Sequence, residues 1–501
     1  MTPDHNAPLF NFQDPEDIHR IKDVFDAAGY TDAGILGTLG VTNLSSIRGN
    51  NLLLLHRTGR GTPLDTFIRL FLIKIPCELE TVRHAVMPMQ IGAWAEAGLV
   101  RIDRGSVAAA VELLPYKDLL IAYDPSDILR TSLKEHYVMG IGSSTITLDN
   151  LTVRRSSART LDLGTGNGIH GLLASSHSDQ VTSIDLNPRA VAFAAFNATL
   201  NGISNMECVQ GDLLKPVRGM TFDLVVTNPP FVISPETRYI YRDGGMQADG
   251  ITRKIVQGVP GFLNEGGFCQ ILCNWAVKRG EDWHERLSKW FVGAGSDVWT
   301  MRSMTEDVAE YAAKWIRHTE RDDTAGYRER FREWMTYYEA QDIEAVCSGI
   351  ITMRRSSGRA NWFRWDDTPE KMLGPCGDSV VLGFQLQDFL ASMEKVEDLL
   401  NARMRFSPDV RLERQSTPSV DGWMEEVTRI HLTKGFAYSG NIDPFIANLI
   451  VGCDGKHSLR ELLGKMSDSL GANPRDITPA FCKIARELIE KGYLLPEPAE
   501  G

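Results

Sequence analysis

The stretch TLDLGTGNGIH at residues 160–170 decides the fold of this chain. Leu161 and Leu163 predict a short buried strand, and three alternating glycines follow it. The next residues, IHGLLAS, are compatible with a helix. A strand, a glycine turn and a helix in this order let backbone N–H groups approach a ligand at the start of the helix. The spacing G-x-G-x-G differs from the dinucleotide fingerprint G-x-G-x-x-G, so the turn alone indicates no particular ligand.

Strands and helices alternate around and after this turn, over residues 158–279. Five strand-like stretches follow one another: TLDLGTG, QVTSIDLN, MECVQGDLL, FDLVVTNPPF and GGFCQILCNWA. The helix PRAVAFAAFNATLNG separates the second from the third, with Pro188 in its first turn and Gly202 after its end. DVWTMRSM and VCSGIITMRR predict a sixth and a seventh strand, separated by a helical insertion at about residues 306–342. The alternation predicts a parallel, doubly wound α/β sheet, whose ligands bind at the carboxyl ends of the strands.

Polar motifs fall at three of these predicted strand ends. Asp185 ends the second strand, where a carboxylate can accept hydrogen bonds from ribose hydroxyls. Gly211-Asp212 ends the third strand, where a carboxylate can face an exocyclic amine, and NPPF at residues 228–231 ends the fourth. An Asp at a strand end can also cap the next helix, and NPP can be a plain turn. Three such motifs in order, and in register with the predicted sheet, are improbable by chance.

The four motifs LDLGTGNG, TSIDLN, QGD and TNPPF together resemble the class I S-adenosylmethionine-dependent methyltransferases. The NPPF form resembles the branch that methylates planar nitrogens. That branch includes adenine-N6 methyltransferases of DNA, base-amino methyltransferases of ribosomal RNA and release-factor glutamine methyltransferases. The resemblance covers residues 134–355 and implies a Rossmann-like seven-stranded core with S-adenosyl-L-methionine as the cofactor. Residues 134–145 resemble the segment that closes over the cofactor in this fold.

The resemblance also implies roles for single residues. The residues expected to bind the cofactor lie in and around the glycine turn and at the strand ends: Asp162, Gly164, Thr165, Gly166, Gly168, Asp185, Leu186, Asn187, Gly211, Asp212 and Asn228. The residues expected to act on the methyl acceptor are Asn228, Pro229, Pro230 and Phe231. Asn228 and the carbonyl of Pro229 would accept the two hydrogens of a planar NH₂ group, which aims its lone pair at the methyl. Phe231 would stack on a flat amide or base.

Two further units flank the predicted core, which we place at residues 126–358. Residues 1–125 and residues 378–501 both combine helices with short strands and are winged-helix-like. The first unit carries 11 Lys and Arg against 15 Asp and Glu, and residues 421–501 carry 9 against 12, so a nucleic-acid grip by either unit is disfavoured. The C-terminal part resembles an actinobacterial-type group of proteins of similar length. The matching residues are Gly440, Asp443, Pro444 and residues 453–455 and 492–496, and this resemblance implies no substrate.

Composition limits the partners and the compartment. The formal net charge of −12 over 501 residues disfavours an overall grip on nucleic acid but leaves room for a local basic cleft. The eight cysteines are scattered without metal-site spacing, which predicts buried or free thiols in a reducing cytosol. The N-terminus lacks the pattern of a signal peptide, and the apolar run FIRLFLIKIP is broken by Arg69 and Lys74. We therefore expect a cytoplasmic protein with no membrane span.

We predict an N-methyltransferase that acts on a planar nitrogen, either the side-chain amide of a protein glutamine or a base amine of RNA or DNA. The acidic balance favours a protein acceptor, or ribosomal RNA reached through a local nucleic-acid contact. The alternative is a catalytically degenerate scaffold that binds S-adenosylmethionine in a larger complex, against which the intact glycines and NPPF argue. A nicotinamide dehydrogenase fits less well, because NPP has no role in hydride transfer. No oligomeric state follows from these motifs.

Overall fold

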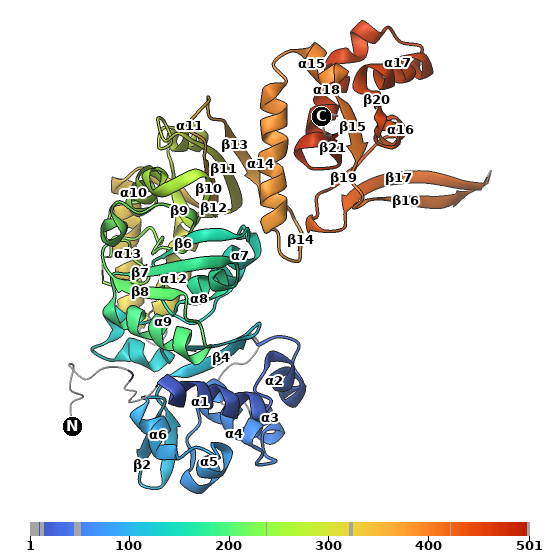
Figure 1. Ribbon diagram of the computed structural model, residues 1–501. Coiled ribbons are helices and arrows are strands. Elements are labelled where there is room, and N and C mark those ends of the chain that lie inside the picture. Colours follow the sequence, from blue (N-terminus) through green and yellow to red (C-terminus); the bar gives the residue numbers. More distant parts are fainter. Residues whose placement is uncertain are drawn as a thin grey trace. The chain divides into compact units, whose positions relative to one another are not determined.

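The computed structural model describes residue 10 and residues 15–44, 52–236, 238–319, 324–420 and 422–497. The ends of the two predicted flanking units, at 1–9, 11–14 and 498–501, and residues 320–323 of the predicted insertion lie outside the described residues. The chain forms two compact units, Met1–Leu148 with Arg155–Trp365 and Asp149–Arg154 with Asp366–Gly501 (Figure 1). The first unit therefore contains both the predicted N-terminal unit and the predicted core. The predicted boundaries at 125, 358 and 378 stay predictions.

An eight-stranded sheet of order β13-β11-β12-β10-β9-β6-β7-β8 forms the centre of the first unit (Figure 1). Its strands are β6 (Ser157–Leu163), β7 (Ser178–Asp185), β8 (Met206–Gln210), β9 (Phe222–Thr227), β10 (Leu263–Lys278), β11 (Ser296–Asp307), β12 (Ile343–Arg355) and β13 (Phe363–Asp367). Strands β6 to β10 run parallel, and β12 is antiparallel to its neighbours β10 and β11. Strands β6 to β12 are the seven predicted ones, so the predicted α/β fold class is confirmed.

The eighth strand continues the sheet past residue 358, where the sequence places the end of the core. β13 pairs with β11 at the sheet edge. The buried carboxylate of Asp297 in β11 holds this region, because Arg354 and Arg359 donate to its Oδ2 at 2.6 and 2.7 Å. The strand sequence FRWDD is half exposed and lacks an apolar run, which explains why its pattern does not predict a strand.

The helices of the core follow the predicted alternation. They are α7 (Ser143–Leu151), α8 (Ile169–Ala174), α9 (Pro188–Leu200), α10 (Gly250–Gly258), α11 (Trp283–Ser288), α12 (Val308–Thr319) and α13 (Thr324–Ala340). The side chain of Asn187 accepts a hydrogen bond from Arg189 N and caps α9, with Pro188 at the first helical position. The predicted helical insertion corresponds to α12 and α13.

The N-terminal part of the first unit contains helices followed by short strands. The helices are α1 (Pro15–Ala27), α2 (Asp32–Leu39), α3 (Leu52–Arg57), α4 (Pro63–Phe67), α5 (Leu79–Ala85) and α6 (Ile91–Glu96). The strands are β1 (Cys77–Glu78), β2 (Val100–Asp103), β3 (Ser106–Ala109), β4 (Glu112–Tyr116) and β5 (Leu119–Tyr123). The apolar run FIRLFLIKIP begins at the end of α4 and continues as a π-helical segment, Ile68–Ile73. The winged-helix-like description of this part stays a prediction.

Helix α9 joins this N-terminal part to the sheet. It packs against β7 and β8 on the one hand and against α1 on the other (Figure 1). Asn197 Nδ2 donates to Ala122 O at 2.9 Å, and Ala122 N donates to Asn197 Oδ1 at 2.8 Å. Asn201 makes the same pair of bonds with Leu120, each 2.9 Å long. The two amides thus pair with the edge of β5 as a neighbouring strand would, and this holds the N-terminal part on the core.

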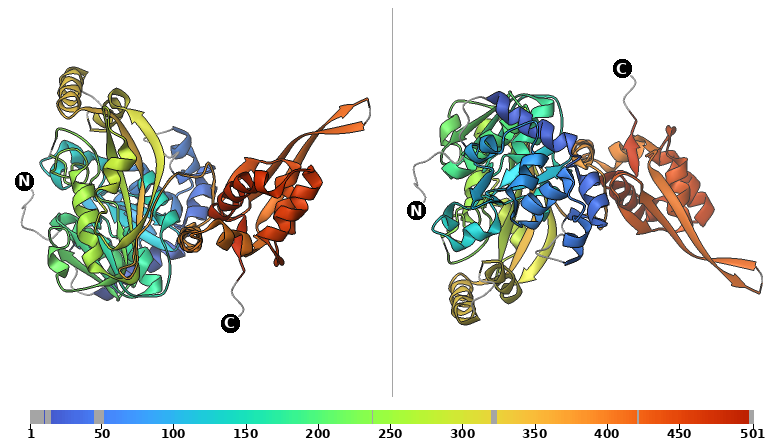
Figure 2. Two further views of the ribbon diagram at one scale, coloured as in Figure 1. Left: turned by 90° about the horizontal axis from the view of Figure 1, so that it is seen from above. Right: turned by 90° about the horizontal axis from the view of Figure 1, so that it is seen from below.

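The second unit combines helices with three small sheets, of order β14-β18, β20-β15-β21 and β16-β17-β19. Its helices are α14 (Gly377–Ser392), α15 (Val396–Asn401), α16 (Pro444–Gly452), α17 (Leu459–Leu470) and α18 (Pro474–Glu490). Its strands are β14 (Met372–Leu373), β15 (Arg403–Phe406), β16 (Val410–Ser419), β17 (Gly422–Leu432), β18 (Gly435–Phe436), β19 (Ser439–Asn441), β20 (Asp454–Ser458) and β21 (Leu494–Pro496). The stretch CDGKH at residues 453–457 lies mostly in the short strand β20. Strands β16 and β17 extend as a two-stranded ribbon from their unit (Figure 2).

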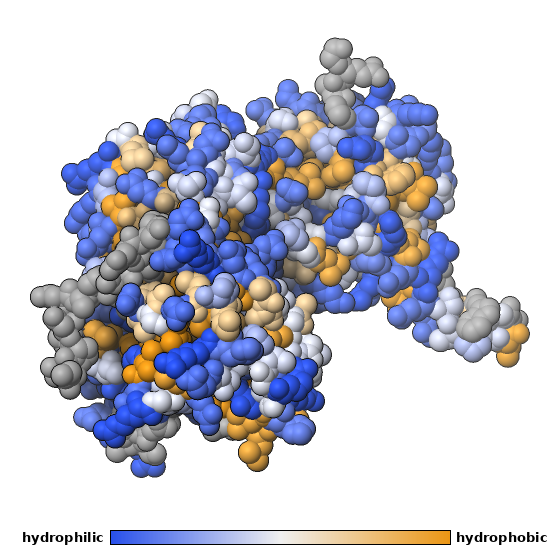
Figure 3. Space-filling view, turned by 60° about the horizontal axis from the view of Figure 1, so that its bottom comes forward, coloured by the Kyte–Doolittle hydropathy of each residue, from blue (hydrophilic) through white to orange (hydrophobic). Residues whose placement is uncertain are grey.

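On the face shown in Figure 3, hydrophilic residues dominate and hydrophobic ones form separate groups. All eight cysteines are free thiols, and six of them are buried. Among the described residues, none of the helices combines the length and the apolar composition that crossing a membrane requires.

Candidate active site

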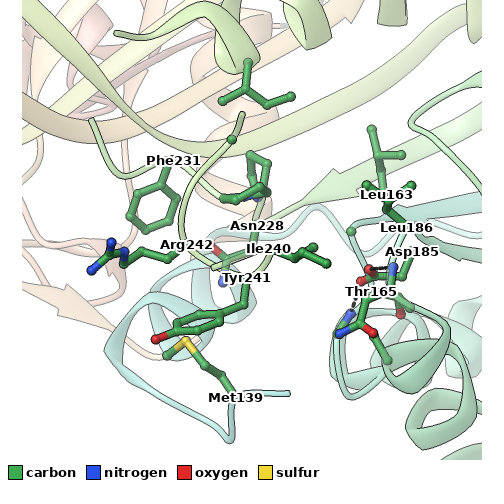
Figure 4. Close-up of a pocket in the computed structure, with 18 of the residues that line it drawn as sticks. Met139, Leu163, Thr165, Asp185, Leu186, Asn228, Phe231, Ile240, Tyr241 and Arg242 are labelled. Carbon is green, nitrogen blue, oxygen red and sulfur yellow. Dashed lines mark hydrogen bonds between the residues drawn. The ribbon is translucent and has the colours of Figure 1, made fainter. Parts of the chain in front are cut away.

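A pocket of about 390 Å³ opens at the carboxyl ends of β6, β7 and β9. Of the residues predicted for the site, all except Asp162 and Gly168 line it. Figure 4 shows the pocket with Asn228 between two groups of side chains. Thr165, Asp185 and Leu186 lie on one side, and Phe231, Tyr241 and Met139 lie on the other. The sheet therefore brings residues from distant parts of the sequence into one cavity.

The glycine turn needs backbone conformations that favour glycine. Gly164, Gly166 and Gly168 have φ values of 74°, 56° and 91°. A Cβ at Gly166 would meet nothing within 4 Å, so this part of the turn is open. A Cβ at Gly168 would lie 3.0 Å from Ala194 Cα, which means that Gly168 allows α9 to pack closely on the turn. The turn is held to β7, because Gly164 N and Thr165 N both donate to Ile184 O, at 2.8 and 2.9 Å.

Asp162 lies behind the turn and fixes its shape. Its Oδ2 accepts hydrogen bonds from Thr165 Oγ1 at 2.5 Å and from Gly171 N at 2.9 Å. Its Oδ1 is buried without a hydrogen-bond partner among the described residues. Burial raises the pKa of this carboxyl to about 6, although the two hydrogen bonds lower it, and the nearby charge of Asp185 adds to the rise. Asp162 therefore positions the turn from outside the pocket.

Two other carboxylates face the pocket from neighbouring strand ends. Asp185 Oδ2 accepts a hydrogen bond from Gly166 N and its Oδ1 accepts one from Asn187 N, both at 2.9 Å. Burial raises the pKa of Asp185, while these backbone donors lower it. Asp212 is more exposed and forms a 2.7 Å ion pair with Lys215, whose side chain lowers the pKa of the carboxyl. Each carboxylate oxygen has a second lone pair, so Asp185 can accept from a ligand without releasing the turn.

Asn228 follows β9 directly. Thr227 Oγ1 donates to Leu163 O at 2.7 Å, which ties the end of β9 to the end of β6 beside the glycine turn. Asn228 Nδ2 donates to Ser144 Oγ of α7 at 3.4 Å. Within the described part of the chain, no hydrogen bond to Asn228 Oδ1 is formed. The amide is therefore oriented by its nitrogen, while its oxygen keeps its accepting capacity.

The segment at residues 134–145 borders the pocket, as the resemblance implies. Tyr137, Val138, Met139, Gly140, Ser144 and Thr145 are among the lining residues. Asn187 Nδ2 donates to His136 O and Asn167 Nδ2 donates to Met139 O, each at 2.9 Å. The side chains of the second strand end and of the glycine turn therefore hold this segment in place.

Several lining residues carry no motif that the sequence pattern could single out. They are Ile240, Tyr241 and Arg242 of the loop after NPPF, His170 of α8 and Trp315 of α12. The ring of Tyr241 packs edge-on against that of Tyr137, with centroids 5.3 Å apart, and its hydroxyl is buried without a hydrogen-bond partner among the described residues. The one available signal is position, because the loop directly follows NPPF.

Comparisons with known proteins agree with this geometry. Residues 139–291 match the family model described as Methyltransferase small domain. Residues 27–110 and 383–496 match two models described as Domain of unknown function, DUF7059 and DUF7782. A release factor glutamine methyltransferase of Geobacter sulfurreducens is 32% identical over 128 residues, which covers 23% of this chain and 45% of the relative.

A ribosomal RNA small subunit methyltransferase C of Alcanivorax borkumensis is 29% identical over 116 residues, which covers 23% of this chain and 32% of the relative. This chain thus spans less than half the length of both relatives. The crystal structure of a methyltransferase from Pyrococcus furiosus aligns with a TM-score of 0.28 and 15% identity, over 46% of this chain and 94% of that one.

The sheet order and the glycine turn define a class I methyltransferase domain. Residues 139–291 match the methyltransferase small domain family, and the cofactor that this match indicates is S-adenosylmethionine. The residues present fit this cofactor. The open turn at Gly166 admits a ligand close to the backbone, Asp185 offers oxygens for ribose hydroxyls, and the exposed side chain of Leu186 offers an apolar surface for a flat ring.

Proposed function

We propose that this protein transfers a methyl group from S-adenosylmethionine to a planar nitrogen of a protein or an RNA. The observation that carries the proposal is the single pocket in which Asn228 lies between the glycine turn and a group of aromatic side chains (Figure 4). The alternative, a degenerate scaffold, would require neither an oriented Asn228 amide nor an accessible glycine turn.

The proposed division of roles follows from the pocket. When bound, the cofactor supplies a methyl group that is already activated on a sulfonium. Asp185 binds the ribose hydroxyls, Asp212 the adenine amine, and the backbone around Gly166 the remainder of the donor. This chain therefore contributes binding and alignment, whose effect on rate can be large when the reacting atoms are held in line.

Asn228 and Pro229 orient the acceptor. The lone pair of a planar NH₂ group is delocalised, and it becomes available when both hydrogens are drawn to fixed acceptors. Asn228 Oδ1 and the carbonyl of Pro229 supply these two acceptors, and Phe231 packs on the flat group. Asn228 cannot take up a proton at neutral pH, so the acceptor loses its proton after methyl transfer and to solvent.

The acceptor is either a glutamine side chain or a base amine, as the names of the two relatives suggest. One feature favours RNA in spite of the net charge of −12. Arg218, Arg253 and Lys254 are exposed along the hollows next to the pocket, and Lys254 lines the pocket itself. None of the three forms an ion pair among the described residues. A local cluster of unpaired cations is the feature that attracts a phosphate backbone.

The test uses labelled S-adenosylmethionine and a cell lysate separated afterwards into protein, RNA and DNA. We expect label in protein or RNA with the wild type and a loss of about 100-fold or more with Asn228→Ala, because a misaligned acceptor reacts slowly. Calorimetry with S-adenosylhomocysteine is the control, and Asn228→Ala should bind it within a few-fold of the wild type. Binding without any transfer by the wild type would support the scaffold, and label that is unaffected by Asn228→Ala would contradict the assigned role.

A further inference from the structure

The loop between β9 and α10, described over residues 228–236 and 238–249, forms the acceptor side of the pocket and is held by the helical insertion. Tyr311 of α12 and Tyr338 of α13 are both fully buried. Ile233 N donates to Tyr311 Oη at 3.2 Å, and Tyr338 Oη donates to Ile233 O at 2.8 Å. Two tyrosine hydroxyls of the insertion thus satisfy both backbone polar groups of one loop residue, two positions after Phe231.

The insertion also binds the far end and the middle of the loop. Ala248 N donates to Tyr337 Oη at 2.7 Å. The carboxylate of Glu236 accepts from Trp334 Nε1 at 3.1 Å and from Arg330 at 3.3 Å, both in α13. Four aromatic residues of α12 and α13 therefore bind the loop at three separate points, and each bond uses a polar group that would be costly to leave unpaired in a buried place.

The buried side chain of Arg242 connects these contacts of the loop to the wall of the pocket. Arg242 is 2% exposed and donates to Asp243 at 2.7 Å and to Glu236 at 2.9 Å. Its guanidinium lies 5.7 Å from the ring centre of Trp334. Because Tyr241 precedes Arg242 directly, the anchored arginine fixes the backbone from which the Tyr241 ring enters the pocket (Figure 4).

The insertion reaches the pocket directly as well. Trp315 of α12 lines the cavity together with Phe231 and Tyr241. Phe231 and Trp315 also pack against one apolar cluster, which contains Tyr311, Trp334 and Tyr338. By contrast, hydrogen bonds on the donor side join the glycine turn to β7, to Asp185 and to Asp162. The two sides of the pocket are therefore supported by different parts of the chain.

We propose that helices α12 and α13 set acceptor recognition, because they fix the loop that carries Tyr241 and supply Trp315 to the wall that the acceptor meets. The inference rests on the proposed methyl transfer. Trp315 and Tyr241 are then contact residues for a flat acceptor group, whereas Trp334 and Tyr338 are positioning residues that act through the loop.

The experiment compares Trp315→Ala, Trp315→Phe, Tyr338→Phe and Trp334→Phe with the wild type. The matched control is Tyr327→Phe, because Tyr327 lies on the same helix α13, stacks on Phe331 and makes no hydrogen bond to the described residues of the loop. Each protein is titrated with the lysate fraction that accepts label from S-adenosylmethionine, which gives an apparent KM for that fraction and a maximal rate. Affinity for S-adenosylhomocysteine and hydrogen exchange of residues 233–248 are measured in parallel.

We expect Trp315→Ala, Tyr338→Phe and Trp334→Phe to raise the apparent KM for the acceptor fraction at least fivefold, with affinity for S-adenosylhomocysteine within twofold. Trp315→Phe should restore part of the loss, and only the Trp334 and Tyr338 variants should speed hydrogen exchange in the loop. An unchanged KM, or equal losses with Tyr327→Phe, would overturn the inference while the proposed function stands. A wild type that labels no fraction would overturn both.

Discussion

At the scale of single residues, the protonation of Asp162, which supports the glycine turn, makes the stability of the protein depend on pH. Its carboxyl is 1% exposed, and burial raises the pKa from 3.8 to about 6. Because the folded state binds this proton more tightly than the unfolded state, the stability it contributes is present below about pH 4 and is lost as the pH rises through 6. We expect the unfolding free energy of the wild type, relative to Asp162→Asn, to fall by about 2 kcal/mol between pH 4 and pH 7.

Denaturant titrations of both proteins at pH 4, 5.5 and 7 measure this difference. The comparison isolates one group, since all other carboxyls are common to the two proteins. A difference that does not change with pH would contradict the raised pKa. A difference that grows with pH would mean that the hydrogen bonds from Thr165 and Gly171 outweigh the burial of the carboxyl.

Site residues could be predicted from the sequence where each of them directly follows a predicted strand of the parallel sheet. Asp185, Asp212 and Asn228 each follow an apolar strand, and parallel strands end at one edge of a sheet, so their place in one pocket follows from the pattern. Tyr241 and Trp315 could not be predicted in this way. Trp315 lies on α12, and the loop that carries Tyr241 is held by tyrosine hydroxyls about a hundred positions away in the sequence, such as that of Tyr338 on Ile233. No periodicity encodes such pairs.

At the scale of elements, helix α9 joins the N-terminal part of the first unit to the central sheet, and the stability of the unit therefore depends on it. Asn197 is fully buried and bonds to both backbone groups of Ala122 and to Asn167 O, so it joins β5 to the glycine turn. We expect Asn197→Ala to lower the unfolding free energy by about 2–4 kcal/mol, because it leaves several backbone groups unpaired in a buried place. Denaturant titration measures the loss, and Thr199→Ala on the same helix should change stability by less than about 1 kcal/mol. Equal losses in both variants would contradict the bridging role.

The elements themselves were predictable to different degrees. Strands β6 to β10 are apolar runs between turn residues, and α9 begins at the predicted proline, because both signals are local. The edge strand β13 has only two apolar residues, Phe363 and Trp365, which pack on Phe291, so its pattern is too short to indicate a strand. Beside it, Asp297 pairs with Arg354 and Arg359. The contact of α12 and α13 with the loop after NPPF could not be predicted either. The aromatic residues of a helical insertion indicate that it packs on another part of the chain, but the local sequence does not say on which loop.

At the scale of the whole molecule, the net charge disfavours binding of RNA, whereas the exposed cations beside the pocket favour it. The chain carries a net charge of −12, which repels nucleic acid at long range. The carboxylates in the loop before α10 are withdrawn from the surface, because Glu236 and Asp243 pair with the buried Arg242, and Asp249 pairs with Arg286. The carboxylate of Asp212 faces Lys254, but Arg218 and Arg253 form no ion pair among the described residues, so binding of RNA should depend on contact at this place.

The double variant Arg253→Glu with Lys254→Glu tests this reasoning. If RNA is the acceptor, we expect a fluorescent single-stranded RNA to bind the wild type, with an affinity that falls with salt at a slope of about −0.7 per phosphate contact. The variant should lose at least tenfold in affinity and flatten that slope. Arg475→Glu with Lys483→Glu changes the charge of exposed residues of α18 by the same amount and should leave both quantities unchanged. Equal losses in the two variants would show that net charge alone governs binding, and no binding by the wild type at low salt would leave a protein glutamine as the acceptor.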